Sequence, residues 1–409
     1  MRLLLPGLTA LLLVSTAQAQ AQDLTAEVAH SWTSGGEAAA VKVIVDSFTA
    51  KGGEWVDWSV AGFESANAAY ISRLLAGDPP TAKTAVAGPE VTELIAQGLM
   101  NDIDAAYHAA VPEGVVPQVV LDAITVDGKV YMAPTGMHAG NWMFYSKPVF
   151  EKAGIAEAPR SWDEFFAAMD KIKAAGITPI AWGGQSWQEG IVFHGVVLSV
   201  IGEEAFTRLY TDGDLSVIDT PEFAQAVETF GKLRDYVDAG APGRNWNDAT
   251  AMVIKDEAGV QLLSDFIKGE FSTAGEVAGT DYGCALVPGS DSLITLADAF
   301  SFPKTGNADE DAAQALLAEV VLDPTVQAEF SVIKGSVPIR TDIDTSGFDV
   351  CAQEAIALVR ADKIVLDSAM TLSPAINGGF KDAVGAYFAD PSMSVESFIE
   401  QYKAAFANG

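Results

Sequence analysis

Residues 28–37, Val-Ala-His-Ser-Trp-Thr-Ser-Gly-Gly-Glu, join an apolar run to a segment with helical periodicity. The apolar run ends at Ala29, and apolar side chains recur at helical spacing between Val41 and Phe48. This order predicts a strand, a polar turn and a helix. In open α/β sheets, ligands bind at the carboxyl ends of strands, where such turns lie. The stretch therefore predicts an α/β fold with a candidate binding turn close to the N-terminus.

Two side chains of this turn can contact a ligand. Trp32 offers a flat apolar face, and because burial of tryptophan in a glycine-rich turn is unusual, we expect it to face the ligand. Glu37 has two interpretations. It accepts hydrogen bonds from a ligand, or it completes a capping box with Ser34 at the start of the helix.

Residues 1–21 have the pattern of a secretory signal peptide. Arg2 supplies the positive start, an apolar run spans residues 8–14, and Ala17-Gln18-Ala19 is a small-residue cleavage site. The apolar run is too short to cross a bilayer. We therefore expect a soluble protein that is exported through a cleaved signal peptide.

The rest of the chain is long and strongly acidic. Roughly 390 residues exceed what a single core usually holds, so we expect two lobes. The formal net charge of -31 disfavours binding to nucleic acid or to anionic lipid. Because the carboxylates are scattered along the chain, we interpret them as an adaptation that keeps the protein soluble in a saline setting.

Strand, turn and helix recur further along the chain. Residues 55–75 and 81–99 repeat the pattern, which predicts a mainly parallel sheet. Residues 134–145 form an extended run with small residues in the middle, which we interpret as a crossing between lobes. His138 and Asn141 would lie at this crossing, where His138 is either a hinge residue or a ligand contact.

A second polar and aromatic turn follows another strand. Residues 177–181 read as a buried strand and lead to the turn at 182–189, which contains Trp187 and Gln188. Trp246 lies in a further loop before a helix. Two facing turns would form a cleft, although Trp187 and Trp246 fit a lobe core equally well.

The sequence lacks common motifs of nucleophile and cofactor sites. It contains no Gly-x-Ser-x-Gly elbow, Walker loop or dinucleotide fingerprint. The four histidines show no metal-ligand spacing, so we expect neither a metal nor a cofactor. Tryptophan with amide or carboxylate groups suits a neutral polyhydroxylated ligand, whose C–H face stacks on the ring while its hydroxyls form charge-assisted hydrogen bonds.

Two thiols are present. Cys284 and Cys351 form a disulfide in an oxidising compartment, or they are buried free thiols.

Several motifs together resemble a known family, the periplasmic sugar-binding proteins of ABC importers (extracellular solute-binding protein family 1). The resemblance covers nearly the whole mature chain and is strongest to the glucose-binding group. The motifs are Trp32-Thr33-Ser34-Gly35-Gly36-Glu37, Gly183-Gly184-Gln185-Ser186-Trp187-Gln188, Gly243-Arg244-Asn245-Trp246-Asn247, Lys268-Gly269-Glu270-Phe271, Lys334-Gly335-Ser336-Val337-Pro338 and Phe348-Asp349-Val350-Cys351.

The resemblance implies an α/β architecture, the type II periplasmic-binding-protein fold, with two lobes and a hinged ligand cleft between them. We expect lobe 1 to comprise residues 22–135 and 296–345, and lobe 2 to comprise residues 136–295 and 346–409. Cys284 and Cys351 match the cysteine pair of the family.

The resemblance also implies roles in the cleft. Trp32 matches a stacking tryptophan, and Glu37, Asp298 and Lys334 match hydroxyl-binding charged residues. From the residues alone, the alternative for Asp298 is a strand-end cap, and the alternative for Lys334 is a solvated charge. The expected ligand contacts are Trp32, Glu37, His138, Asn141, Trp187, Gln188, Trp246, Phe266, Asp298 and Lys334.

The chain departs from the family pattern at several positions. Ser31 replaces the first of two adjacent tryptophans, Ala87 replaces a lysine, and Phe266 replaces a tryptophan. Residues 369–371 read Ala-Met-Thr where the family carries Ala-His-Gly. Because polar contacts and aromatic area are lost, the sequence does not predict glucose itself.

The expected function is that of a receptor without catalytic residues. It would capture a small carbohydrate as a monomer and deliver it to the permease subunits of an ABC transporter. Two alternatives remain open: a periplasmic carbohydrate hydrolase with Glu37 and Asp298 as acid and base, and a sensor or scaffold with the same fold.

Overall fold

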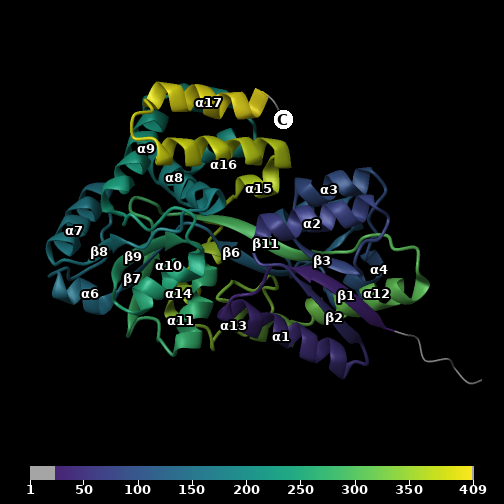
Figure 1. Ribbon diagram of the computed structural model, residues 1–409. Coiled ribbons are helices and arrows are strands. Elements are labelled where there is room, and N and C mark those ends of the chain that lie inside the picture. The colour runs from purple at the N-terminus through teal and green to yellow at the C-terminus, as the bar shows by residue number, and fades with distance from the viewer. Residues whose placement is uncertain (1–23, 408–409) are drawn as a thin grey trace, which may run out of the picture.

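The computed structural model describes residues 24–407, so the expected signal peptide at residues 1–21 lies outside the described residues. Two β-sheets covered by helices lie side by side, the first on the right and the second on the left of Figure 1. Strands β6 (Met132–Ala139) and β11 (Leu293–Ser301) run between the two halves. The molecule is therefore a two-lobed α/β protein, as expected.

The strands of the predicted repeats are parallel, as expected: β1 pairs in parallel with β2 and with β3. The complete first sheet is mixed, because β11 is antiparallel to β3 and β6 although it is parallel to β12. The strands lie in the order β12 (Ile364–Leu366), β11, β3 (Ala82–Val86), β1 (Thr25–His30) and β2 (Glu54–Ser59), with β6 also paired to β11.

Helix α1 (Gly35–Ala50) follows β1 as the opening stretch predicts. The Ser34 hydroxyl accepts a hydrogen bond from the backbone N–H of Glu37, and the Glu37 carboxylate accepts one from the backbone N–H of Ser34, so the capping box is present. Val41, Ile44 and Phe48 are buried at the predicted spacing. The other helices around this sheet are α2 (Phe63–Leu75), α3 (Pro89–Ala96), α4 (Asp104–Ala110), α5 (Gln118–Ile124), α12 (Ala308–Leu322) and α13 (Pro324–Lys334), and a small hairpin consists of β4 (Thr125–Val126) and β5 (Lys129–Val130).

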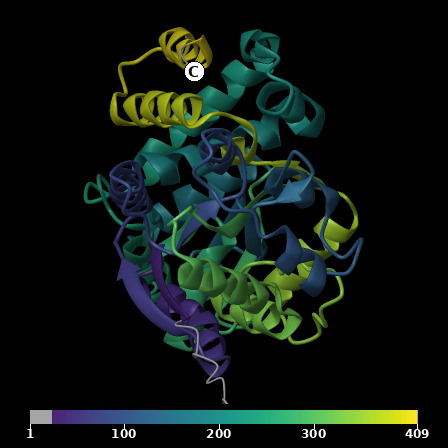
Figure 2. The same ribbon diagram turned by 90° about the vertical axis from the view of Figure 1, so that its right-hand side faces the viewer.

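The second sheet has four strands and encloses a separate apolar core. Its strands lie in the order β10 (Tyr282–Leu286), β7 (Trp142–Ser146), β9 (Ala258–Leu263) and β8 (Thr178–Ile180). The surrounding helices are α6 (Lys147–Lys152), α7 (Trp162–Ala174), α8 (Ser186–Tyr210), α9 (Pro221–Lys232), α10 (Trp246–Ile254), α11 (Lys268–Ala274), α14 (Val350–Arg360), α15 (Ser368–Thr371), α16 (Pro374–Ala389) and α17 (Val395–Ala407), and short 3-10 turns are η1 (Leu215–Asp219), η2 (Leu233–Tyr236) and η3 (Asp265–Ile267). In Figure 2, α16 and α17 (yellow) form the top of the molecule, far from β1 and β2 (purple).

Helix α8 is the longest of the described helices and continues through a kink at Gly202. By length and composition it is the one helix among residues 24–407 that could cross a membrane. Its apolar side chains, such as Phe193 and Val196, are buried in the core of the second lobe. We therefore interpret α8 as a core helix.

Cys284 and Cys351 form the disulfide, so that expectation is confirmed. Their Cα atoms are 6.0 Å apart, and the bond ties β10 to the first turn of α14.

Candidate ligand-binding site

A cavity of about 340 Å³ lies between the two lobes. The first lobe lines it with Trp32, Glu37 and Lys334, and the second with Trp187 and Phe266, among other residues. This volume is at the lower end of the range of roughly 300–1,000 Å³ for small-molecule sites. The cleft has the size of a site for one small molecule.

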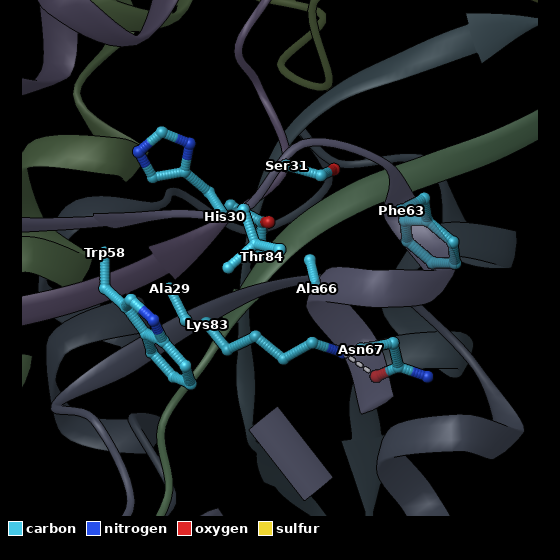
Figure 3. A pocket seen from close by; sticks show the side chains of 10 residues that line it. Ala29, His30, Ser31, Trp58, Phe63, Ala66, Asn67, Lys83 and Thr84 are labelled. Atoms are coloured by element: carbon cyan, nitrogen blue, oxygen red, sulfur yellow. Dashed lines mark hydrogen bonds between the residues drawn. The ribbon is translucent and has the colours of Figure 1, made fainter. Parts of the chain in front are cut away.

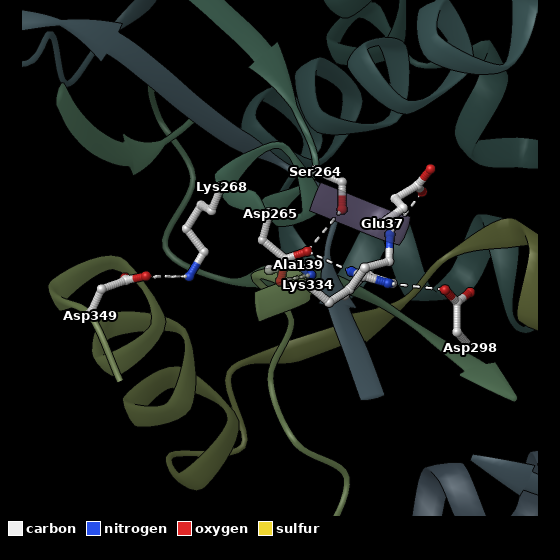
Figure 4. Close-up of polar contacts among 9 residues, drawn as sticks. Glu37, Ala139, Ser264, Asp265, Lys268, Asp298, Lys334 and Asp349 are labelled. Atoms are coloured by element: carbon white, nitrogen blue, oxygen red, sulfur yellow. Dashed lines mark hydrogen bonds and ion pairs between the residues drawn. The ribbon is translucent and has the colours of Figure 1, made fainter. Parts of the chain in front are cut away.

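Glu37 combines both roles considered for it. Its Oε2 accepts from the backbone N–H of Ser34 (3.5 Å), which is the capping contact. Its Oε1 accepts from Nζ of Lys334 (3.0 Å), and the residue lines the cavity. One carboxylate oxygen therefore holds the start of α1 while the other forms an ion pair at the cleft (Figure 4).

Lys334 is a buried cation between two aromatic rings. Its Nζ lies 5.8 Å from the ring centroid of Trp32 and 5.0 Å from that of Phe266, distances at which ring faces attract a cation. Gly335 follows with a φ of +90°, and a Cβ there would lie 2.7 Å from the carbonyl oxygen of Asp265. Glycine therefore allows α13 to end against the second lobe with Lys334 facing the cleft.

Trp32 borders the cavity and also packs against the core of the first lobe. The indole is 6% exposed, and its ring centroid lies 5.9 Å from Phe300 and 5.4 Å from Phe330. A tryptophan held on one side by two phenylalanines presents a fixed apolar surface to the cavity on another.

The sequence predicts Asp298 at the end of a strand. In the structure it instead lies inside β11, at a bulge. His138 on β6 lies between this carboxylate and that of Asp265: Nε2 is 3.1 Å from Oδ2 of Asp298, and Nδ1 is 2.7 Å from Oδ1 of Asp265. Asp298 and His138 line the cavity, whereas Asp265 is buried and does not line it. Figure 4 shows the carboxylates of Asp265 and Asp298.

Asp265, His138, Asp298 and Lys334 each favour the charged form of a neighbouring side chain. Burial would raise the pKa of Asp298, but His138 and Lys334 hold it below its usual value. Burial would lower the pKa of His138, but the carboxylates of Asp265 and Asp298 raise it to about 9. At neutral pH the cleft therefore contains an imidazolium beside a carboxylate.

The second lobe supplies an aromatic wall. The ring of Phe266 meets Trp246 edge to face at 4.9 Å and lies 6.2 Å from Trp187. All three residues line the cavity. Trp187 and Trp246 thus line the cleft and also pack at the edge of the core.

Asn141 and Gln188 do not line the cavity. Asn141 is buried, where its Oδ1 accepts from the backbone N–H of Ile294 (2.8 Å) and its Nδ2 donates to the carbonyl oxygen of Ser292 (2.9 Å). Gln188 donates to Oε1 of Gln185 (2.9 Å) and to the carbonyl oxygen of Arg244 (3.1 Å). Both side chains hold the backbone near the cleft, so we remove them from the proposed ligand contacts.

Several lining residues are absent from the sequence-based list. Asp367 follows β12 and lies 3.6 Å from Nδ1 of His194, measured from its Oδ2. Burial would raise the pKa of Asp367, but His194, the backbone N–H of Ala369 and Lys381 lower it. The other lining residues missed by the sequence analysis include Gln185, Asn245, Asn247 and Lys381. Strand β12 directly precedes Asp367, but its three residues are too few to show a strand pattern in the sequence.

A second cavity beside β1 is too small for a sugar. Its volume of about 10 Å³ is that of a single water site. Lys83 on its wall donates to Oδ1 of Asn67 (2.6 Å, Figure 3) and to Oε1 of Glu90 (2.7 Å). Within residues 24–407, no group of three or more His, Cys, Asp or Glu side chains is arranged to hold a metal ion.

The chain has two lobes, each built on its own sheet, and a polar and aromatic cleft lies between them. This architecture defines a two-lobed binding protein. The model of the bacterial extracellular solute-binding protein family matches residues 31–325. The chain belongs to this family.

Curated relatives support the assignment. Probable sugar-binding periplasmic proteins of Brucella suis and Mesorhizobium japonicum are 39% and 37% identical to the chain. The first match covers 82% of this chain and 79% of that protein, and the second covers 92% and 94%.

Solved structures share the fold. The bacterial solute receptor AcbH, described as having an exclusive substrate preference for β-D-galactopyranose, aligns with a TM-score of 0.79 at 19% identity and covers 93% of this chain and 97% of its own. The maltose-bound MalE3 of T. maritima aligns with a TM-score of 0.77 at 19% identity, over 94% and 99%.

Proposed function

We propose that this protein is the sugar-binding receptor of an ABC importer and that it captures one small uncharged carbohydrate in the cleft between its lobes. The captured sugar passes to the membrane permease. The observation that carries the proposal is the cleft itself, in which a stacking indole and two charge-paired carboxylates from one lobe face three aromatic rings from the other.

The pairing of charges favours an uncharged ligand. Glu37 is paired with Lys334 and Asp298 with His138, while Asp367 lies near His194. A sugar acid or an amino sugar would bring an unpaired charge into this site, which is costly to desolvate. Hydroxyl groups instead receive charge-assisted hydrogen bonds without adding charge.

The size of the cleft favours a monosaccharide or a similarly small carbohydrate. A volume of about 340 Å³ lies at the lower end of the usual range for small-molecule sites. The names and ligands of the relatives support a sugar but differ among themselves, so they support the class and not one compound.

The remaining parts of the proposal concern the setting. Residues 1–21 act as a cleaved signal peptide, and the receptor works as a monomer in the periplasm without binding nucleic acid. The lobes divide near residues 135, 295 and 345, although β12 pairs with the first sheet from within residues 346–409. That strand would thus belong to lobe 1.

The hydrolase alternative lacks support. A glycosidase of this kind needs one carboxyl group with a raised pKa that acts as the acid. The pKa of Asp298 is lowered instead, and the relatives named for their ligands are binding proteins or receptors.

A thermal-shift screen followed by calorimetry tests the proposal. We expect a rise in Tm with at least one of D-glucose, D-galactose, D-xylose and L-arabinose, since a ligand that binds only the folded state stabilises it. D-Glucuronate and D-glucosamine serve as charged controls and should give no shift. Release of product from nitrophenyl glycosides, or a response restricted to the charged sugars, would contradict the proposal.

A further inference from the structure

His138 bridges two carboxylates through both of its ring nitrogens. Nδ1 lies 2.7 Å from Oδ1 of Asp265, and Nε2 lies 3.1 Å from Oδ2 of Asp298. Ionised carboxylates only accept hydrogen bonds, so each ring nitrogen must carry a proton to form both contacts. A histidine with two N–H groups is an imidazolium.

The two carboxylates differ in their surroundings. Asp265 is 2% exposed and does not line the cavity. Its Oδ2 accepts from the backbone N–H of Ala139 (3.0 Å), and its Oδ1 also accepts from the Ser264 hydroxyl (3.3 Å). This carboxylate is therefore fixed from three directions, and it fixes the imidazole ring in turn.

Asp298 is the partner that faces the ligand. Its side chain is 19% exposed and lines the cavity. Among the described residues, the hydrogen-bond contact of its carboxylate runs through Oδ2 to His138. That geometry leaves Oδ1 to accept from a group in the cavity.

We propose that His138 is a positioning residue: held as an imidazolium by Asp265, it keeps Asp298 anionic and in one orientation, so that the cleft selects sugars with a hydroxyl that donates to Asp298. The inference rests on the proposed function and deepens it. His138 then acts on the ligand through Asp298. Asp265 contributes from outside the cavity, because it holds His138.

The neighbouring charges agree with this role. Asp265 on η3 and Asp298 on β11 face the imidazole directly. Lys334 on α13 pairs with Glu37 on α1 and, together with His138, lowers the pKa of Asp298. Asp367 and Lys381 line the same cavity. Because the pKa of His138 is raised to about 9, from its ordinary value of 6.5, the arrangement persists at neutral pH and is lost as the pH rises through about 9.

Nitrogen NMR of histidine-labelled protein tests the charge without any ligand. His138 is assigned by comparison with His138→Gln among the four histidines. We expect both ring nitrogens of His138 to be protonated at pH 8. A neutral tautomer at pH 8 would overturn the proposal.

The variant Asp265→Ala tests the link to binding. It removes a charge outside the cavity and, unlike Asn, places no N–H donor opposite a protonated Nδ1 of His138. The probe is whichever of D-glucose, D-galactose, D-xylose and L-arabinose binds the wild type most tightly. We expect roughly 5- to 20-fold weaker binding at pH 8, and recovery to within about 2-fold of wild type at pH 5.5, where a histidine of ordinary pKa regains its proton.

The outcomes separate the two proposals. An equal loss at pH 8 and pH 5.5 would show a merely structural role for Asp265 and would overturn the inference, as would wild-type affinity at both pH values. If the wild type binds none of the four sugars, the proposed function fails and the selection by Asp298 fails with it. Should Asp265→Ala not fold, His138→Gln replaces it. The affinity of the wild type must then fall near pH 9 while that of His138→Gln does not change with pH, and parallel profiles would overturn the inference.

Discussion

At the scale of single residues, the cleft depends on side chains that serve the fold and the ligand together. Trp32 packs against Phe300 and Phe330 while bordering the cavity, and Glu37 caps α1 while binding Lys334. Substitutions at these positions therefore change stability as well as affinity. The experiments need matched buried controls that lie outside the cavity.

Trp32→Ala should weaken sugar binding at least 10-fold and also lower the unfolding free energy by about 3–5 kcal/mol, the usual cost of truncating a buried aromatic residue. Calorimetry measures the first effect and urea unfolding the second. Phe300→Leu is the control, because Phe300 touches Trp32 but does not line the cavity. Equal affinity losses in both variants would mean that the indole acts only through packing.

Lys334→Met should weaken binding by about 1.5–3 kcal/mol, the range for a hydrogen bond that involves a charged group. The variant also leaves Glu37 without its cationic partner. Lys268→Met is the control, since Lys268 is as buried as Lys334 but pairs with Asp349 away from the cavity. Calorimetry that shows unchanged affinity for Lys334→Met would remove this lysine from the site.

Two of the expected contacts show why sequence alone is insufficient at this scale. Asn141 lies between β6 and β7 and Gln188 in the first turn of α8, and both have polar or aromatic neighbours in the sequence, as Trp187 and Asp298 do. Asn141 bonds to Ile294, 153 residues away, and Gln188 bonds to Arg244, 56 residues away, as well as to the nearby Gln185. A local pattern identifies a polar side chain near the cleft but not the direction in which it points.

At the scale of helices and strands, the sequence predicted the features that depend on neighbouring residues, such as helix caps, but not those that depend on pairing between distant strands. The capping box and the apolar spacing place α1 correctly. Strand β11 continues past Asp298 because it pairs with both β3 and β6, which are distant in sequence. Strand β12 was missed because three residues within a helical region carry little pattern.

Reduction of the disulfide should lower the unfolding free energy by about 4 kcal/mol on the loop-entropy model, since the bond closes a loop between residues 67 positions apart. Sugar affinity should not change, because neither cysteine lines the cavity. Urea unfolding of wild type and of the double variant Cys284→Ser and Cys351→Ser measures the first effect, and calorimetry measures the second. A large loss of affinity in the folded double variant would show that the bond shapes the cleft.

At the scale of the whole molecule, the two-lobed fold was predictable from chain length and repeated strand–turn–helix units, whereas the placement of the cleft needed long-range pairing. The net charge of -31 is a property of this scale too. Mutual repulsion destabilises the compact state, and salt screens it.

We expect Tm to rise when KCl is increased from 10 mM to 2 M, because screening relieves repulsion among the scattered carboxylates. Scanning calorimetry at several KCl concentrations measures the effect, and potassium sulfate distinguishes screening from exclusion of salt at the surface. A Tm that is indifferent to KCl would refute the interpretation of the acidic surface as an adaptation to salt.

The most direct test of the account is a crystal structure of the protein grown with the tightest-binding sugar from the panel. We predict one sugar between the lobes, with its ring against Trp32 and a hydroxyl group within hydrogen-bond distance of Oδ1 of Asp298. A sugar bound on another surface, or in the cleft without contact to either residue, would contradict it.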